Sequence, residues 1–170
     1  MGLGADAGMR VFGTVEELRS ATGAHLGYSD WVLVDQQRVD TFADATGDHQ
    51  WIHVDPARAA SGPFGTTVAH GYLTLALVPS LVGFLVDYAG WAVKINYGSN
   101  KVRFPAPVPV GSSVRAGAVL AGVDEVAAGV QVTLQVSVDV QTPDGVMTSK
   151  PALVAEVLTL LAAPVAPPAG

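Results

Sequence analysis

Apolar and polar residues alternate strictly over residues 130–140, which is the clearest pattern in the chain. A period of two predicts an antiparallel strand with one face in the core and the other in water. The apolar face carries Val130, Val132, Leu134, Val136, Val138 and Val140. Four further apolar segments beside turn residues are also predicted strands: residues 26–34, 91–104, 113–123 and 152–161.

Two short helices are predicted in the first third of the chain. Thr14 and Glu17 have the spacing of a capping box, and apolar residues then recur every three positions before Gly23. Asp35 can cap a second helix, in which apolar residues follow the i, i+3, i+4, i+7 pattern until Gly47 ends it. Both helices are therefore bounded by residues that commonly cap helix ends.

A longer helix is predicted to begin near Ala69, and it is apolar on nearly every face. It follows a loop over residues 47–55 and a single helical turn that Asp55-Pro56 starts. Because helices and strands are largely segregated along the chain, their order predicts an α+β fold. A sheet curled around the long helix would bury all of its apolar faces.

Composition supports this picture and excludes several classes of protein. Of 170 residues, 49% are hydrophobic and 14% are charged, which fits one compact domain with a core. We expect this domain to span residues 13–162, after a flexible N-terminus (residues 1–12) and before a disordered Pro/Ala tail (residues 163–170). The chain has no Cys, so disulfides, Cys-based zinc sites and cysteine nucleophiles are excluded.

Charge and hydropathy bear on partners and location. Acidic residues outnumber basic ones 15 to 9, and the net charge of −6 argues against nucleic acid as a partner. The apolar stretch 69–86 is interrupted by His70, Thr74 and Pro79, whereas a membrane span needs about 20 mostly apolar residues. The N-terminus has no signal-peptide pattern, so we expect a cytoplasmic protein that does not enter membranes.

Ionisable residues are scarce, yet five Asp and His residues gather between positions 48 and 70: Asp48, His49, His53, Asp55 and His70. A loop can bring Asp48 beside His53, and a carboxylate next to an imidazole is a general acid/base pair. The alternative is that Asp48 caps a turn and His53 packs in the core. His49 and His53 have an i, i+4 spacing, which converges on one metal ion only within a continuous helix. A loop is predicted there, so no metal site is expected.

The long helix opens with Ala69-His70-Gly71. The first N–H groups of a helix are unpaired and lie at the positive end of its dipole. Without a side chain, Gly71 lets a substrate carbonyl approach, so its N–H is a candidate oxyanion donor. Close packing of Gly71 against the sheet is an equally open interpretation. No Ser or Cys nucleophile with a neighbouring base is evident, so covalent catalysis is not expected.

Residues 42–81 resemble the hydratase motif of the MaoC-like, (R)-specific enoyl-CoA hydratase family. The family pattern has an Asp, a His five residues later, then Asp-Pro, and a His-Gly about 17 residues after that His. Here these positions are Asp48, His53, Asp55-Pro56 and His70-Gly71. Looser similarity covers most of the chain, which looks most like the single-domain group that includes nodulation protein N.

The resemblance implies a hot-dog fold, in which an antiparallel sheet wraps around a long central helix, and a homodimer joined through sheet edges. It also implies reversible syn hydration of trans-2-enoyl-CoA to (R)-3-hydroxyacyl-CoA. Asp48 and His53 would hold and activate the water and handle the proton delivered to C2, while the Gly71 N–H would bind the thioester oxygen. The thioester itself acidifies C2, so no cofactor is expected beside the acyl-CoA substrate.

Several positions depart from the family pattern. Gln50-Trp51 stand where many members have Asn-Pro, and Thr74 and Ser80 are the available hydroxyls on a helix that often carries a Ser in the site. The further candidates for substrate contacts are Gln50, Trp51, His70 and Ser80. Candidate ligands for the CoA phosphates are Lys94, Lys101 and Arg103, which could equally form a solvated strand face.

Two alternative functions remain open. Hot-dog proteins include many acyl-CoA thioesterases, and some are non-catalytic acyl-thioester-binding subunits of larger dehydratases. The order and spacing of Asp48, His53 and Asp55-Pro56 favour hydration, because they resemble the hydratase motif. The presence of both Asp48 and His53 argues against an inert subunit.

Overall fold

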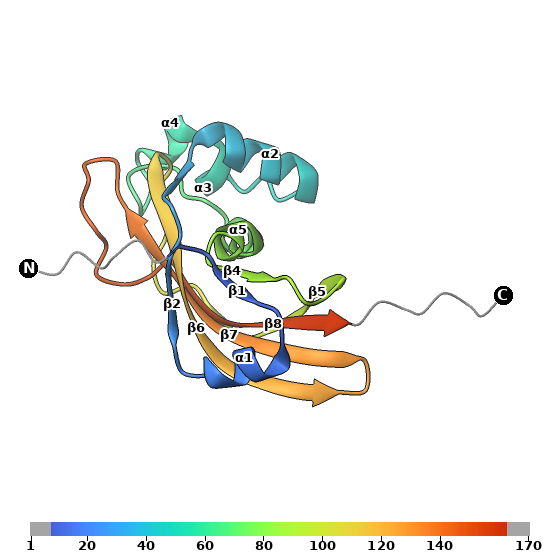
Figure 1. Ribbon diagram of the computed structural model, residues 1–170. Coiled ribbons are helices and arrows are strands. Elements are labelled where there is room, and N and C mark those ends of the chain that lie inside the picture. The colour runs from blue at the N-terminus through green and yellow to red at the C-terminus, as the bar shows by residue number, and fades with distance from the viewer. Residues whose placement is uncertain (1–7, 163–170) are drawn as a thin grey trace, which may run out of the picture.

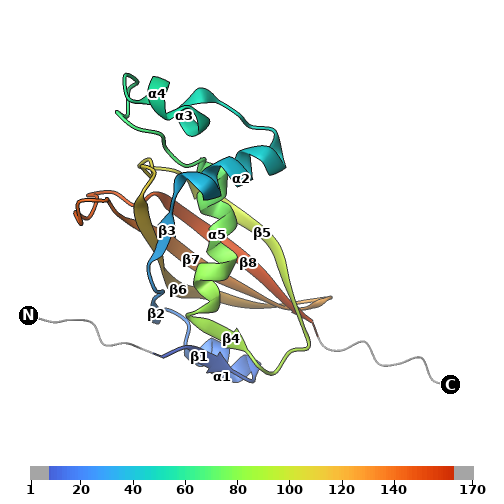
Figure 2. The ribbon, with the colours of Figure 1, turned by 90° about the horizontal axis from the view of Figure 1, so that it is seen from above.

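The computed structural model describes residues 8–162. Helix α5 (Gly71–Gly83) runs across one face of a six-stranded sheet that curves around it (Figures 1 and 2). The strand order is β2-β6-β7-β8-β5, every pair is antiparallel, and β3 pairs with β6 on the same edge as β2. The strands are β2 (His25–Tyr28), β3 (Val32–Val34), β5 (Val93–Arg103), β6 (Ser112–Val126), β7 (Gly129–Gln141) and β8 (Leu153–Ala162).

Four shorter helices lie at the two ends of the sheet. They are α1 (Val15–Ser20), α2 (Gln36–Thr46), α3 (Trp51–Val54) and α4 (Pro56–Ala59). Helices α2, α3 and α4 gather beyond the N-terminal end of α5, whereas α1 lies at the opposite end (Figure 2). Within residues 8–162, no helix combines the length and the apolar content that crossing a bilayer demands.

The sheet wrapped around a long helix confirms the α+β, hot-dog arrangement. The alternation in β7 is realised as predicted, with its even-numbered residues buried and its odd-numbered residues more exposed. Val132, Leu134 and Val138 are at most 1% exposed and belong to the same core as Leu73 and Leu81 on α5. Burial of this strand face against the helix therefore forms the centre of the molecule.

The predicted caps of the first two helices are present. The Thr14 hydroxyl accepts from the Glu17 N–H (3.2 Å), and the Glu17 carboxylate accepts from the Thr14 N–H (3.3 Å), which completes the capping box. Asp35 accepts from the Arg38 N–H (2.9 Å) at the start of α2. Gly47 ends α2 with φ +77°, a left-handed conformation that glycine adopts without steric cost.

The predicted strand over residues 26–34 is divided into β2 and β3. Ser29 lies between them, and its N–H donates to the Ala116 carbonyl (2.8 Å). The Ala116 N–H donates in turn to the Ser29 hydroxyl (3.0 Å) rather than to a main-chain carbonyl. A side-chain acceptor thus replaces a ladder bond at this point, and the strand is interrupted.

The N-terminal region also differs from the expectation. Residues 10–12 belong to the predicted flexible N-terminus, but they form β1 (Arg10–Phe12), which pairs in parallel with β4 (Val86–Tyr88). This pairing joins segments far apart in the chain, so no local pattern indicates it. Residues 1–7 and the predicted disordered tail, residues 163–170, lie outside the described residues.

Leu81 on α5 is fully buried and offers a test of this core. We expect Leu81→Ala to lower the free energy of unfolding by about 2–5 kcal/mol, because the substitution removes buried carbon atoms and leaves a cavity. The matched substitution Leu33→Ala, at a half-exposed side chain, should have a much smaller effect. Urea denaturation followed by circular dichroism measures both losses, and equal losses would contradict this core.

Candidate active site

Three ionisable side chains from separate segments meet at the N-terminal end of α5. Asp48 lies in the loop after α2, His53 lies on α3, and His70 directly precedes α5. One carboxylate oxygen of Asp48 and one nitrogen of each ring lie within 4.8 Å of one another. The structure thus brings together two residues predicted for catalysis and one predicted for substrate contact. We call these three residues the acid–base cluster.

A short helix, α3, replaces the loop predicted after α2. The His53 N–H donates to the Gln50 carbonyl (2.9 Å) within its first turn. Gln36 on α2 holds this turn in place, because its Nε2 donates to the His53 carbonyl (2.7 Å). The Gln36 Oε1 accepts from the Thr67 hydroxyl (2.6 Å), which ties the turn to the segment before α5. Sequence reasoning missed Gln36, since its partners lie 17 and 31 residues away.

His53 is 7% exposed, and a main-chain carbonyl orients its ring. Nδ1 lies 2.6 Å from the Val68 carbonyl oxygen. Because a carbonyl can only accept, the proton of the neutral ring lies on Nδ1 and the lone pair remains on Nε2. Val68 is itself held by a hydrogen bond from its N–H to the Ile52 carbonyl (3.0 Å). The ring therefore has a fixed tautomer with one nitrogen available as a base.

Burial lowers the pKa of His53, and the neighbouring His70 lowers it further. The Val68 carbonyl and Asp48 act in the opposite direction on the same pKa but do not reverse the shift. A lowered pKa keeps the ring neutral at neutral pH, which is the form that can accept a proton. By contrast, the exposed His49 lies 2.9 Å from the Asp44 carboxylate, which raises the pKa of His49.

The stacking of the His53 and His70 rings argues against a shared metal ion. Their centroids are 3.8 Å apart and their planes differ by 26°. A metal bound at about 2.1 Å lies along the in-plane lone pair of a ring nitrogen, so two stacked rings cannot both direct a lone pair at one ion. His49 precedes α3 and does not share a helix with His53. The stacked geometry is therefore unfavourable for a metal ion shared by both rings.

Gly71 is the first residue of α5, so its N–H has no acceptor within the helix. A Cβ at this position would lie 3.0 Å from Cγ of Phe104 and would have to displace the ring. This close approach supports the packing interpretation of Gly71. The N–H beside the acid–base cluster also lacks an intrahelical bond, as an oxyanion donor requires, so the two interpretations are compatible.

Of the other predicted substrate contacts, Trp51 packs against the next helix and Ser80 lies far along α5. Gln50 precedes α3, and its side chain makes no capping bond. The Trp51 ring packs against Gly62 and beneath Arg58, whose Cζ lies 4.4 Å from the ring centroid. Ser80 is exposed and lies nine residues along α5 from the start of the helix, a distance of about 14 Å. The Trp51 ring therefore packs against α4.

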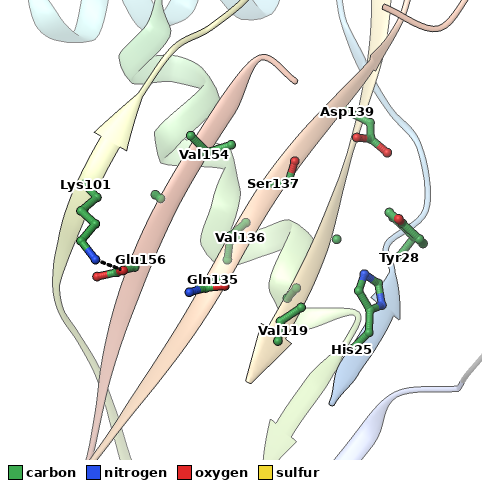
Figure 3. A pocket seen from close by; sticks show the side chains of 13 residues that line it. His25, Tyr28, Lys101, Val119, Gln135, Val136, Ser137, Asp139, Val154 and Glu156 are labelled. Atoms are coloured by element: carbon green, nitrogen blue, oxygen red, sulfur yellow. Dashed lines mark hydrogen bonds and ion pairs between the residues drawn. The ribbon is translucent and has the colours of Figure 1, made fainter. Parts of the chain in front are cut away.

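The three basic residues on β5 do not form one site. Lys94 donates to Asp87 beside α5, whereas Lys101 donates to Glu156 (2.6 Å) on the outer face of the sheet. Arg103 donates to a carbonyl of its own strand (2.7 Å). Lys101 and Glu156 line a groove of about 410 Å³. Figure 3 shows the strands of the sheet between these two side chains and α5. The groove is thus separated from the acid–base cluster by the sheet.

Two adjoining cavities run between α5 and β5 on the inner face. Their volumes are about 400 and 290 Å³, and most of their lining is apolar. The first begins at Leu75, one turn after Gly71, and the second reaches Gly83 at the end of the helix. The two cavities adjoin, since both are lined by Val78, Pro79, Asn96 and Val157, and together they are called the channel.

Comparisons with known proteins identify the family and the fold of the chain. Residues 17–142 match the family model described as MaoC like domain. The chain is 56% identical over 149 residues to 3-hydroxyacyl-thioester dehydratase Z of Mycobacterium tuberculosis, covering 87% of this chain and 95% of that protein. It is 39% identical over 156 residues to nodulation protein N of Rhizobium leguminosarum bv. viciae, covering 87% and 91%. The solved (R)-hydratase of A. caviae has the same fold, with a TM-score of 0.64, 24% identity, and coverage of 82% and 96%.

The pKa values of His53 and His49 are shifted in opposite directions, which provides a test of the environment of each ring. In a nuclear magnetic resonance titration of the imidazole protons, we expect His53 to titrate below the ordinary histidine pKa of about 6.5 and His49 above it. Burial disfavours the charged form of His53. The Asp44 carboxylate favours the charged form of His49. Asp44→Asn should lower the pKa of His49 and leave that of His53 in place. A higher pKa for His53 than for His49 would contradict this geometry.

Proposed function

Because the chain belongs to the MaoC-like dehydratase family, we propose that it is an (R)-specific enoyl-CoA hydratase. It adds water across trans-2-enoyl-CoA to give (R)-3-hydroxyacyl-CoA, and it catalyses the reverse dehydration. The observation that carries the proposal is the placement of Asp48 and His53 together beside the N-terminus of α5. The name of the 56% identical relative, a 3-hydroxyacyl-thioester dehydratase, supports the same substrate class.

In the proposed reaction, Asp48 and His53 hold one water molecule between them. The free Nε2 of His53 accepts a proton from this water as its oxygen bonds to C3 of the enoyl group. Electron density moves through C2 to the thioester oxygen, where the Gly71 N–H stabilises the developing negative charge. Protonation of C2 on the same face, through Asp48 or His53, completes the syn addition. The atoms of one water are thereby added, and no other reactant is consumed.

The channel between α5 and β5 is the proposed site for the acyl chain. It starts one turn from Gly71, so an acyl chain bound in it would run along the helix, with its thioester end near the acid–base cluster. Its lining is mostly apolar, as an acyl chain requires. Leu75 and Val78 on α5 and Val157 on β8 would contact the chain.

Removing either proposed catalytic group should abolish most of the activity. We expect Asp48→Asn and His53→Gln each to lower kcat/KM for crotonyl-CoA hydration by about 10²–10⁴-fold, since each loses an acid–base group. The assay follows the loss of ultraviolet absorbance of the conjugated enoyl thioester. Because the proposed chemistry needs only protons, incubation with EDTA should leave the rate unchanged.

Matched controls are available at neighbouring exposed positions. Asp44→Asn and His49→Gln remove the same charges from an exposed pair outside the cluster, and both variants should keep the wild-type rate. If Asp48→Asn retains full activity, the assigned site is wrong. If free CoA thiol appears in place of the hydrated product, the enzyme is a thioesterase.

A homodimer joined through β5 is the second part of the proposal. Every residue of β5 except Val102 is exposed, and one edge of the strand pairs with β8 while no described strand pairs with the other. Three large side chains on this strand, Val93, Ile95 and Tyr97, are 42–62% exposed. An apolar edge of this kind is a ready surface for a second copy.

Tyr97 is suited to a test of this edge because it falls at a register shift and has no paired residue on β8. We expect Tyr97→Asp to convert the dimer to a monomer, since a two-fold interface places two carboxylates near each other in an apolar seam. Leu33→Asp, at a half-exposed position on the opposite edge, should leave the dimer intact. Sedimentation velocity measures both. A monomeric wild type, or a dimer disrupted only by Leu33→Asp, would contradict the proposed interface.

A further inference from the structure

His70 contacts both members of the proposed catalytic pair. It is 3% exposed, and it occupies the N-cap position of α5, but its side chain accepts no hydrogen bond from the N–H groups of the helix. Ser, Thr, Asp and Asn are the residues usually found at an N-cap, because their side chains accept hydrogen bonds from the first N–H groups of the helix. The contacts of the ring, rather than capping, must therefore account for a histidine here.

The first contact is a hydrogen bond to the main chain of Asp48. The His70 Nε2 lies 2.9 Å from the Asp48 carbonyl oxygen, so the ring N–H donates to it. The Asp48 carboxylate lies farther away, at 4.0 Å from the same nitrogen, and its side chain is 57% exposed. The bond thus fixes the main chain from which the carboxylate projects, and it leaves the carboxylate free to face substrate and water.

The second contact is the stack with His53. The two ring centroids lie 3.8 Å apart, and the Phe42 ring lies 5.0 Å from His70 on a tilted plane. His53 is already held in its own plane by the Val68 carbonyl. The face of His70 then limits movement of the His53 ring out of that plane, so the direction of its free Nε2 is set from two sides.

We propose that His70 is a positioning residue. It holds the Asp48 main chain and the His53 ring in the relative orientation that proton transfer requires. This inference rests on the proposed hydratase function. Asp48 and His53 each have a carboxylate oxygen or ring nitrogen within 4.8 Å of a ring nitrogen of His70. The Nδ1 atom of His70 is buried and has no hydrogen-bond partner among the described residues, so the role assigned to the ring uses Nε2 and the ring face.

Two variants separate the hydrogen bond from the stack. His70→Gln removes the ring but keeps an N–H donor, because the side-chain amide of Gln can extend about as far as the Nε2 of His. His70→Phe keeps a ring against His53 and removes the donor. We expect kcat for crotonyl-CoA hydration to fall about 10- to 100-fold in His70→Phe, as the loss of a buried hydrogen bond implies. The fall in His70→Gln should be several-fold smaller, and KM should change little in either variant.

The pH profile provides a readout that a purely structural role would not move. The charge of His70 is one cause of the lowered pKa of His53, so both variants should raise the pKa of His53. The acid limb of the kcat/KM profile should then move to higher pH in both. The imidazole signal of His53 in a nuclear magnetic resonance titration should move in the same direction, without any need for activity. Thermal unfolding shows that each variant is folded at the assay temperature.

Each result decides between this proposal and the alternatives. Wild-type kcat and an unmoved acid limb in both variants would overturn the positioning role. An equal loss of kcat in the two variants with an unmoved His53 titration would assign His70 to core packing alone, and would also overturn it. If Asp48→Asn leaves hydration intact, the proposed function fails instead. If Asp48→Asn abolishes hydration while the His70 variants behave as wild type, only this inference fails.

Discussion

Helix α5 has few polar side chains on any face, so it is stable only where other elements remove it from water, and the remaining structure depends on this burial. The curved sheet supplies most of that cover through the inward face of β7 and its neighbours. A helix seated across a sheet must end near the edge of the layer, and α2 and α3 close that end. The unpaired N–H groups of α5 therefore emerge beside Asp48 and His53. The packing of α5 in the core thus determines where the acid–base cluster lies.

The proposed catalytic pair joins one buried base to one exposed carboxylate. His53 lies in a low-dielectric environment that keeps it neutral, while the Asp48 side chain remains accessible to solvent. Water and substrate can therefore reach the pair from the Asp48 side, and the hydrogen bond to Val68 prevents the buried ring from turning away. Burial alone would lower the pKa of His53 further, and the Val68 carbonyl limits that shift. The same carbonyl thus fixes both the tautomer and the basicity.

Local features of the structure were predictable from sequence because their causes are local. The alternation in β7, the Thr14–Glu17 capping box and the left-handed end of α2 at Gly47 each depend on neighbouring residues alone. The motif resemblance likewise indicated Asp48, His53 and Gly71. The features that were missed depend on distant contacts: the β1–β4 pair, the Gln36 bonds that stabilise α3, and the carbonyl partners of the two buried histidines. Periodicity and spacing carry no information about such contacts.

Among residues 8–162, the wrapped sheet leaves one side of α5 exposed, at Tyr72, Ala76, Pro79 and Gly83. Tyr72 on the helix and Phe104 after β5 are exposed although their rings lie 5.9 Å apart beside Gly71, and the exposed Pro79 farther along the helix lines both cavities of the channel. Apolar surface that adjoins both a cavity and an unpaired strand edge is unfavourable in water. A second copy paired along β5 would extend the sheet past this side and close the channel. On this view, assembly and substrate binding share one physical cause, because both bury the apolar surface that the single sheet cannot reach.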